Sequence, residues 1–254
     1  MIAATGSSWR RDTVVAGCAR RCQALSWRRV PHARPGTVTT ADLFRDLSDR
    51  PAPVRLGDGA WLLPRFACDR AEALLAALDG VLRQAPLRHM QTPGGHTMTV
   101  AMSCCGERGW HSDAAGYRYT TFDPHCGRRW PPMPAVFVEL AVAAAATAGY
   151  PGFVPDSCLI NRYGADAKLS PHQDRDERDL SHPIVSLSLG LPARFRFGGP
   201  RRRDRLLRTD LEHGDVVVWG GASRLAYHGV LPLAGGRHPS TGDCRYNLSF
   251  RRAG

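Results

Sequence analysis

The chain has 254 residues, of which 43% are hydrophobic and 22% are charged, and its formal net charge at pH 7 is +11. This length allows one large domain or two small ones, and the hydrophobic fraction is sufficient for a packed core. The apolar run at 141–146 is too short and too rich in alanine to span a bilayer, so we expect a soluble protein without a membrane partner. The moderate positive charge suits an anionic partner such as nucleic acid, although ordinary surface charge also accounts for it.

The eight cysteines indicate a reducing compartment. They form no C-x-x-C pair and no zinc-binding spacing, and Cys104 and Cys105 are adjacent, which is a poor geometry for a mutual disulfide. No secretory signal is visible in the sequence. We therefore expect a cytoplasmic protein, and we expect it to be a monomer.

Residues 1–55 differ in composition from the rest of the chain. They contain repeated arginine pairs without sustained periodicity, and the first forty residues hold seven arginines and one acidic residue. An organelle-targeting segment, a disordered basic arm and an extension outside the native product all have this composition. We expect a basic, disordered extension, followed by a folded domain over 56–254.

Two helices are predicted in the first half of that domain. Asp69 and Glu72 have the spacing of a capping box ahead of an apolar run, so the first helix is expected to begin at Asp69 and to end before Pro86. A proline in the first turn and a following glycine predict a second helix over 134–147. Both helices are expected to cover a sheet.

A strand is predicted at 97–102, and a turn-rich stretch with several aromatic residues and arginines follows it. Aromatic residues beside arginines are the composition expected where a base stacks and a phosphate is held, and ordinary packing is the equal alternative.

Short strands separated by glycine and proline dominate the chain after residue 155. The predicted strands are 157–163, 184–189, 194–197, 215–219, 226–231 and 243–251. Together with the two helices, this pattern predicts a mainly β (α+β) fold, namely a barrel or a double-stranded β-helix (jelly roll) with supporting N-terminal helices. No internal repeat is present.

One short segment predicts a metal site. His172 and Asp174 are two residues apart, so on an extended segment they point to the same side, and His228 can complete one face of an octahedron. Two histidines and one carboxylate are the ligands of a non-haem Fe(II) site, which keeps three positions open for a chelating cosubstrate and dioxygen. The alternative is that His172 and Asp174 belong to a solvated turn.

The last predicted strand carries two arginines on one face. Arg245 and Arg251 are six residues apart and share that face with Asn247, and a charge directed into a barrel is costly without an anionic partner. A guanidinium group suits a carboxylate, so a dicarboxylic keto acid such as 2-oxoglutarate would fit. Asn161 and Tyr163 alternate in the same way on another strand. The alternatives are pairing with acidic side chains, exposure to solvent, and an ordinary polar sheet face.

Five segments occur in a characteristic order. They are 90–95 (MQTPGG), 159–163 (LINRY), 172–177 (HQDRDE), 213–221 (HGDVVVWGG) and 244–251 (CRYNLSFR). Together they closely resemble the bacterial AlkB family of alkylated-DNA repair dioxygenases. The resemblance extends from about residue 65 to the C-terminus, and residues 1–55 have no counterpart in it.

The resemblance implies a nucleotide-recognition lid at about 90–130 and roles for particular residues. It places iron on His172, Asp174 and His228, and it places 2-oxoglutarate against Asn161, Tyr163, Arg245, Asn247 and Arg251. For the damaged nucleotide it implies Trp110, Tyr117, Arg118, Tyr119, Asp176 and Arg202. A carboxylate near the base favours a ring-methylated base, because such a base is cationic. For Asp176 and Arg202, membership of a solvated charged run is the alternative.

The function implied by the resemblance is DNA repair by oxidative demethylation of N-alkylated bases such as 1-methyladenine and 3-methylcytosine. The substrate would be single- or double-stranded DNA, with RNA as a further candidate. Fe(II) would be the cofactor, with 2-oxoglutarate and O2 as cosubstrates, and formaldehyde, succinate and CO2 would be released. A base inside a duplex must be flipped out to reach such a site. The rival hypotheses are a dioxygenase acting on a small molecule or a protein, and a non-catalytic metal-binding jelly roll that binds nucleic acid.

Overall fold

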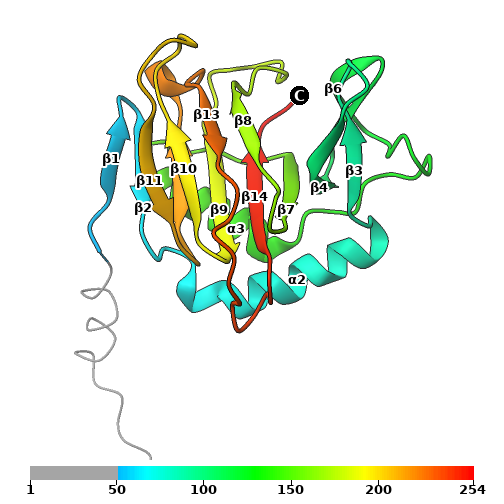
Figure 1. Ribbon diagram of the computed structural model, residues 1–254, viewed down its shortest axis with the longest axis horizontal. Helices are drawn as coiled ribbons and strands as arrows, with labels where there is room; N and C mark the ends of the chain where they lie inside the picture. Colours follow the sequence, from blue (N-terminus) through cyan, green and yellow to red (C-terminus); the bar gives the residue numbers. More distant parts are fainter. Residues whose placement is uncertain (1–50) are drawn as a thin grey trace, which may run out of the picture. The chain divides into compact units, whose positions relative to one another are not determined.

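Two antiparallel sheets face each other in residues 51–254, which are the part of the chain that the computed structural model describes (Figure 1). Within this part, the larger sheet has eight strands and the smaller sheet has four. In order across the larger sheet, the strands are β1 (Val54–Gly57), β2 (Ala60–Leu63), β12 (Val216–Trp219), β9 (Ile184–Gly190), β14 (Arg245–Arg251), β7 (Ser157–Tyr163), β4 (Thr97–Gly106) and β3 (Arg88–Gln91). Across the smaller sheet, they are β11 (Leu207–Leu211), β10 (Ala193–Phe197), β13 (His228–Val230) and β8 (Leu169–His172). This architecture confirms the predicted mainly β, jelly-roll class.

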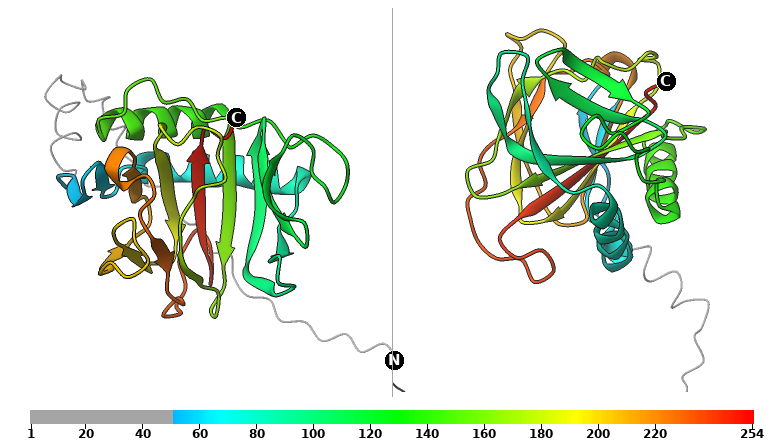
Figure 2. Two further views of the ribbon diagram at one scale, coloured as in Figure 1. Left: turned by 90° about the horizontal axis from the view of Figure 1, so that it is seen from above. Right: turned by 90° about the vertical axis from the view of Figure 1, so that its right-hand side faces the viewer.

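The helices α2 (Ala71–Gln84) and α3 (Ala135–Thr147) pack on the outer face of the larger sheet, opposite the smaller sheet (Figure 2). The second predicted helix is confirmed. The predicted start of the first at Asp69 is wrong by two residues, because a 3-10 turn, η1 (Cys68–Arg70), precedes α2. On α3, buried alanines let the helix approach the sheet closely.

Strand β14 separates an apolar layer from a polar one. Leu248 and Phe250 pack under the helices, whereas Arg245, Asn247 and Arg251 point into the space between the two sheets. Because β14 is a central strand between β9 and β7, all of these side chains are buried. The predicted alternation is therefore present, and it turns a row of polar groups towards the interior.

A hairpin of β5 (Gly109–Asp113) and β6 (Gly116–Thr120) forms a separate two-stranded sheet, which we call the aromatic hairpin. Only a turn-rich stretch is predicted there. The indole of Trp130 packs directly on Gly109, where an added Cβ would lie 2.3 Å from the ring, and its Nε1 donates a hydrogen bond to the Thr120 carbonyl. Glycine at 109 thus lets Trp130 hold the base of the hairpin.

Several strands are absent from the prediction, namely β1, β2, β3, β8 and β11. Strand β1 begins at Val54, so the folded part starts before the predicted boundary at 56. Residues 1–50 of the predicted extension lie outside the described residues. Neither helix in the described part is long and apolar enough to cross a bilayer.

Candidate active site

A cavity of about 470 Å³ lies between the two sheets and is bordered by the aromatic hairpin. Its wall includes side chains from β7, β8, β13 and β14, together with part of the loop that follows β8. Strands that are distant in the sequence therefore bring polar groups to one place. This cavity contains most of the residues that the sequence singles out.

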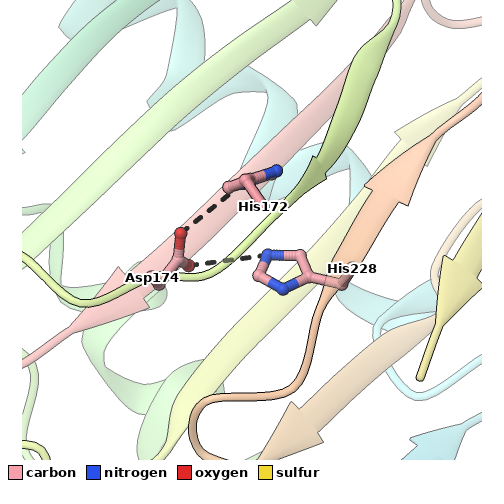
Figure 3. A group of neighbouring side chains, drawn as sticks. All are labelled: His172, Asp174 and His228. Carbon is pink, nitrogen blue, oxygen red and sulfur yellow. Dashed lines mark ion pairs between the residues drawn. The ribbon is translucent and has the colours of Figure 1, made fainter. Parts of the chain in front are cut away.

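His172, Asp174 and His228 converge at the wall of this cavity (Figure 3). The two histidines are direct partners across the β8–β13 ladder, and Asp174 follows in the loop after β8. Nε2 of His172 lies 3.6 Å from Oδ1 of Asp174, and Nε2 of His228 lies 3.7 Å from Oδ2. All three ligand atoms lie within 4.8 Å of one another, as a shared metal ion requires.

The hydrogen bonds of the two imidazoles leave the metal-facing nitrogens free. Nδ1 of His172 lies 2.9 Å from the Ser170 carbonyl, and Nδ1 of His228 lies 3.0 Å from the Ala226 carbonyl. A carbonyl only accepts, so each Nδ1 carries the proton and each Nε2 keeps its lone pair. Burial, and then the neighbouring His172, lower the pKa of His228 to about 4, which keeps it in the neutral, metal-binding form.

Asp174 is held ionised by Arg251. The Nη2 and Nε atoms of Arg251 donate to Oδ2 of Asp174 at 2.6 and 3.2 Å. Burial alone would raise the pKa of Asp174, but the Arg251 guanidinium and the two imidazoles outweigh it and hold this pKa well below its usual range. The predicted alternative of pairing with acidic side chains thus applies to Arg251, although its buried Nη1 has no hydrogen-bond partner. Nη1 remains available to a ligand.

Arg245 is a buried cation with free donors. Its side chain is 1% exposed, Nη2 donates to the Ser188 hydroxyl at 2.9 Å, and the guanidinium lies 5.1 Å from the centre of the Tyr163 ring. Its Nε and Nη1 have no partner, and no carboxylate forms an ion pair with it among the described residues. Burial lowers the pKa of Arg245 and raises that of Tyr163 to about 12. The pair therefore offers several donors suited to a carboxylate.

Two asparagines face each other at the floor of the cavity. Asn161 on β7 is the register partner of Asn247 on β14, and its Nδ2 donates to Oδ1 of Asn247 at 3.3 Å. Asn247 also donates to the Ser186 hydroxyl and the Leu187 carbonyl, so most of its capacity is used within the protein. The buried Oδ1 of Asn161 has no partner. Asn161 is therefore the better placed of the two for a ligand.

At the mouth of the cavity, Trp110 and Tyr117 of the aromatic hairpin stack with ring centres 5.5 Å apart and planes 17° apart. Nε1 of Trp110 donates to Oδ2 of Asp176 at 2.8 Å, although Asp176 belongs to the exposed charged run. Tyr117 is 48% exposed. A flat aromatic surface and a carboxylate thus lie together at the entrance.

The other substrate candidates divide between the cavity and the outer surface. Tyr119 and Arg202 line the cavity, and Arg202 forms no ion pair within the described residues. Arg118 does not line it, because both of its terminal nitrogens bind Asp113, at 2.6 and 2.7 Å. The structure therefore does not bring Arg118 to the predicted site.

Sequence reasoning missed Glu177, which lines the cavity, and Arg224, which forms a buried ion pair of 2.9 Å with it. Glu177 lies in the charged run 174–179, and such runs are ordinarily solvated. Arg224 lies in an unremarkable loop. Glu177 is the last residue of the segment 172–177 that carries the resemblance, but no sequence signal marked its role, and none marked Arg224.

Comparisons with known proteins agree with this geometry. The family model of the 2OG-Fe(II) oxygenase superfamily matches residues 59–251. The "Alpha-ketoglutarate-dependent dioxygenase AlkB" of Escherichia coli (strain K12) is 57% identical over 213 residues, which are 84% of this chain and 98% of that protein. The "DNA N(6)-methyladenine demethylase ALKBH1C" of Arabidopsis thaliana is 33% identical over 179 residues, 60% of this chain and 39% of that protein.

Among solved structures, that of OsALKBH1 superposes with a TM-score of 0.70 at 28% identity and covers 79% of this chain and 100% of the other. Fe(II), 2-oxoglutarate and O2 are the reactants that the superfamily implies, and the donors present here fit them: two imidazole nitrogens, one carboxylate and an unpaired buried guanidinium. Motif order, fold and site geometry therefore agree, and the chain belongs to the AlkB family of 2OG-Fe(II) oxygenases.

Proposed function

We propose that this protein is an Fe(II)- and 2-oxoglutarate-dependent dioxygenase that demethylates N-alkylated bases in nucleic acid, as in the repair of alkylated DNA. The observation that carries this proposal is one cavity, which is lined by His172, Asp174 and His228 (the metal-type cluster), by the unpaired Arg245 and by the aromatic hairpin. The names of the relatives support it, since one is an α-ketoglutarate-dependent dioxygenase and another a DNA demethylase.

His172, Asp174 and His228 would hold Fe(II), and the remaining polar groups would orient the cosubstrate. With O2, the bound iron supplies the oxidising chemistry that converts 2-oxoglutarate to succinate and CO2 and releases the methyl group as formaldehyde. Arg245 and Tyr163 would bind a carboxylate of 2-oxoglutarate through the free guanidinium nitrogens and the phenol. Asn161, Asn247 and the Nη1 of Arg251 would border the same ligand.

The entrance would select the base. Trp110 and Tyr117 offer an aromatic surface on which a flipped or single-stranded base can stack. Asp176 would favour cationic 1-methyladenine or 3-methylcytosine over the neutral base by charge attraction. Arg202 would contact a phosphate, and Tyr119 would border the base from β6. Arg118, which is held by Asp113, would act by keeping the hairpin in shape.

A panel of methylated and unmethylated oligonucleotides tests this function. The protein is incubated with Fe(II), ascorbate and 2-oxoglutarate, and formaldehyde, succinate and repaired bases are measured by mass spectrometry. We expect repair of 1-methyladenine and 3-methylcytosine in DNA, and the same panel in RNA measures the nucleic-acid preference. Succinate formation without repair of any oligonucleotide would instead favour a small-molecule or protein substrate.

Matched histidine variants test the metal assignment. His172→Ala is expected to abolish formaldehyde release, because it removes one of three protein ligands. The exposed His125 lies outside the cavity, so His125→Ala is expected to keep full activity. Turnover by the His172 variant at the wild-type rate would refute the assignment.

We also propose that the protein acts as a monomer in the cytoplasm, on single- or double-stranded DNA. One chain contains the complete cluster of His172, Asp174 and His228 together with Arg245, and the six cysteines in the described residues are free thiols. Analytical ultracentrifugation in the presence and absence of an oligonucleotide measures the assembly state. A dimer as the active species would contradict the proposal.

A further inference from the structure

Glu177 is a buried carboxylate that lines the same cavity as His172, Asp174 and His228. Its side chain is 7% exposed, and the loop that carries it also carries Asp174, three residues earlier. A buried carboxylate is costly unless it is paired. The identity of its partners therefore indicates why a charge is placed there.

Three side chains from separate segments converge on this carboxylate. The hydroxyl of Tyr119, on strand β6 of the aromatic hairpin, donates to Oε1 at 2.8 Å. Nε of Arg251, at the end of β14, lies 3.2 Å from the same oxygen. Nη2 of Arg224 lies 2.9 Å from Oε2. Glu177 is thus shared by the hairpin, the larger sheet and the loop before β13.

Arg224 fixes the loop that carries both carboxylates. Its Nη1 donates to the Asp174 carbonyl at 2.6 Å, and its Nε donates to the His182 carbonyl at 2.9 Å. One buried guanidinium therefore binds the backbone at both ends of the loop and the Glu177 side chain between them. These contacts of Arg224 fix the orientation of Glu177, so that its Oε1 points at Tyr119 and Arg251.

Arg251 continues the chain of contacts to the metal-type cluster. The Nε atom that lies 3.2 Å from Oε1 of Glu177 donates its hydrogen bond to Oδ2 of Asp174 at 3.2 Å, and Nη2 donates to the same Asp174 oxygen at 2.6 Å. Because Arg251 is planar and rigid, moving its Nε away from Glu177 also moves its donor at Asp174. Tyr119, Glu177, Arg251 and Asp174 therefore form a continuous relay from the aromatic hairpin to the carboxylate ligand.

We propose that Glu177 is a positioning residue that transmits the placement of the aromatic hairpin, through Arg251, to the metal ligand Asp174. The inference rests on the proposed function only for the assignment of Asp174 as a metal ligand. When the hairpin is seated, Tyr119 and Arg251 share Oε1 and Asp174 is held in the binding orientation. Displacement of the hairpin would remove the Tyr119 hydrogen bond from Glu177, and the orientation of Asp174 would then be less restricted. The relay thus makes the metal site respond to the state of the entrance.

A double-mutant cycle on Co(II) binding tests the relay without substrate or turnover. The dissociation constant and the visible absorption bands of bound Co(II) are measured for the wild type, Tyr119→Phe, Glu177→Gln and the double variant. Groups that orient a metal ligand typically contribute roughly 10- to 100-fold to metal affinity. We expect about 10-fold weaker binding with altered bands for Glu177→Gln, and about 3-fold weaker binding for Tyr119→Phe.

The coupling between the two changes is the decisive result. In the Glu177→Gln background, Tyr119→Phe is expected to cause no further change, because the relay is already broken. Independent, additive effects, or a Tyr119 variant with wild-type affinity and spectrum, would overturn the proposal. A wild-type protein that binds no Co(II) would instead refute the metal assignment, so failure of the relay and failure of the metal assignment give different results.

Two further variants separate positioning from general stability. Tyr117→Phe changes a half-exposed tyrosine on the same hairpin that does not contact Glu177, and we expect wild-type Co(II) affinity. Glu177→Asp keeps a charge opposite Arg224 but shortens the reach to Tyr119, so it serves if Glu177→Gln fails to fold. Weaker Co(II) binding that is insensitive to Tyr119→Phe is expected for Glu177→Asp, and wild-type coupling in that variant would contradict the relay.

Discussion

Replacing Arg245 with methionine should separate cosubstrate binding from folding. Arg245 has two buried donors, Nε and Nη1, without partners, and its third nitrogen group binds Ser188. A hydrogen bond to a charged group contributes about 1.5 kcal/mol at the low end of the usual range, so two such bonds to a carboxylate contribute about 3 kcal/mol. This free energy corresponds to a roughly 100-fold higher Kd for 2-oxoglutarate in Arg245→Met.

The same substitution should not weaken the ligand-free protein. Folding removes the Arg245 charge from water without placing a carboxylate next to it, and a methionine, although shorter, keeps an apolar side chain at this position without that cost. The free energy of unfolding without 2-oxoglutarate is therefore expected to equal or exceed that of the wild type. Affinity and stability should change in different directions, which is unusual for a buried side chain.

Calorimetric titration of 2-oxoglutarate into the Co(II)-loaded protein measures the first quantity, and urea unfolding measures the second. Arg252→Met is the control, because Arg252 is the exposed neighbour of β14 and should affect neither. A Kd within threefold of the wild type would refute the assignment of Arg245. Loss of affinity together with a large loss of stability would show that Arg245 mainly supports the fold.

Two further predictions concern pH and packing. Burial and the stacked His238 lower the pKa of His213, and Nδ1 of this histidine accepts a hydrogen bond from the Gly190 amide. As the pH falls, the His213 imidazole is therefore protonated in the unfolded chain before it is protonated in the folded protein. The free energy of unfolding should thus fall as the pH drops below about 6.5. Urea unfolding at pH 7.5 and 5.5 should show a smaller fall for His213→Asn, and an equal fall would disprove this source. Gly109→Ala should cost about 1–3 kcal/mol, because its Cβ would overlap the Trp130 ring. Gly80 lies in α2, and an added Cβ there would have only Arg83 within 4 Å. Gly80→Ala should therefore raise the free energy of unfolding by about 0.5–1 kcal/mol, as measured by thermal unfolding. Effects of the same sign for Gly109→Ala and Gly80→Ala would contradict the packing argument.

The parts of the fold that follow from local patterns could be predicted from the sequence. Strict alternation along 245–251 predicted a strand with one polar face, and the structure has that strand at the centre of the larger sheet. Pro134 in the first turn and the glycine that follows predicted the second helix almost to the residue. Both signals lie within one short segment, so they can be recognised without the rest of the fold.

The missed elements depend on tertiary contacts. Strand β8 has only four residues and includes Pro171, which a strand tolerates here because β8 is the edge of the smaller sheet. The aromatic hairpin depends on the contact between Gly109 and Trp130, which are far apart in the sequence. Glu177 resembled its exposed neighbours until the fold placed Tyr119 and Arg224 against it.

The two arginines of β14 show why the site could not be derived from the sequence alone. By spacing alone they are equivalent, since both lie on the polar face of one strand. The structure gives Arg251 two carboxylates, Asp174 and Glu177, and gives Arg245 none. The charge of Arg251 is therefore neutralised by protein carboxylates next to the metal-type cluster, whereas the charge of Arg245 can bind an anionic ligand. A cavity with one neutralised and one unneutralised guanidinium has a directed charge distribution, so a dicarboxylate would enter with one end towards Arg245 and the other towards the cluster.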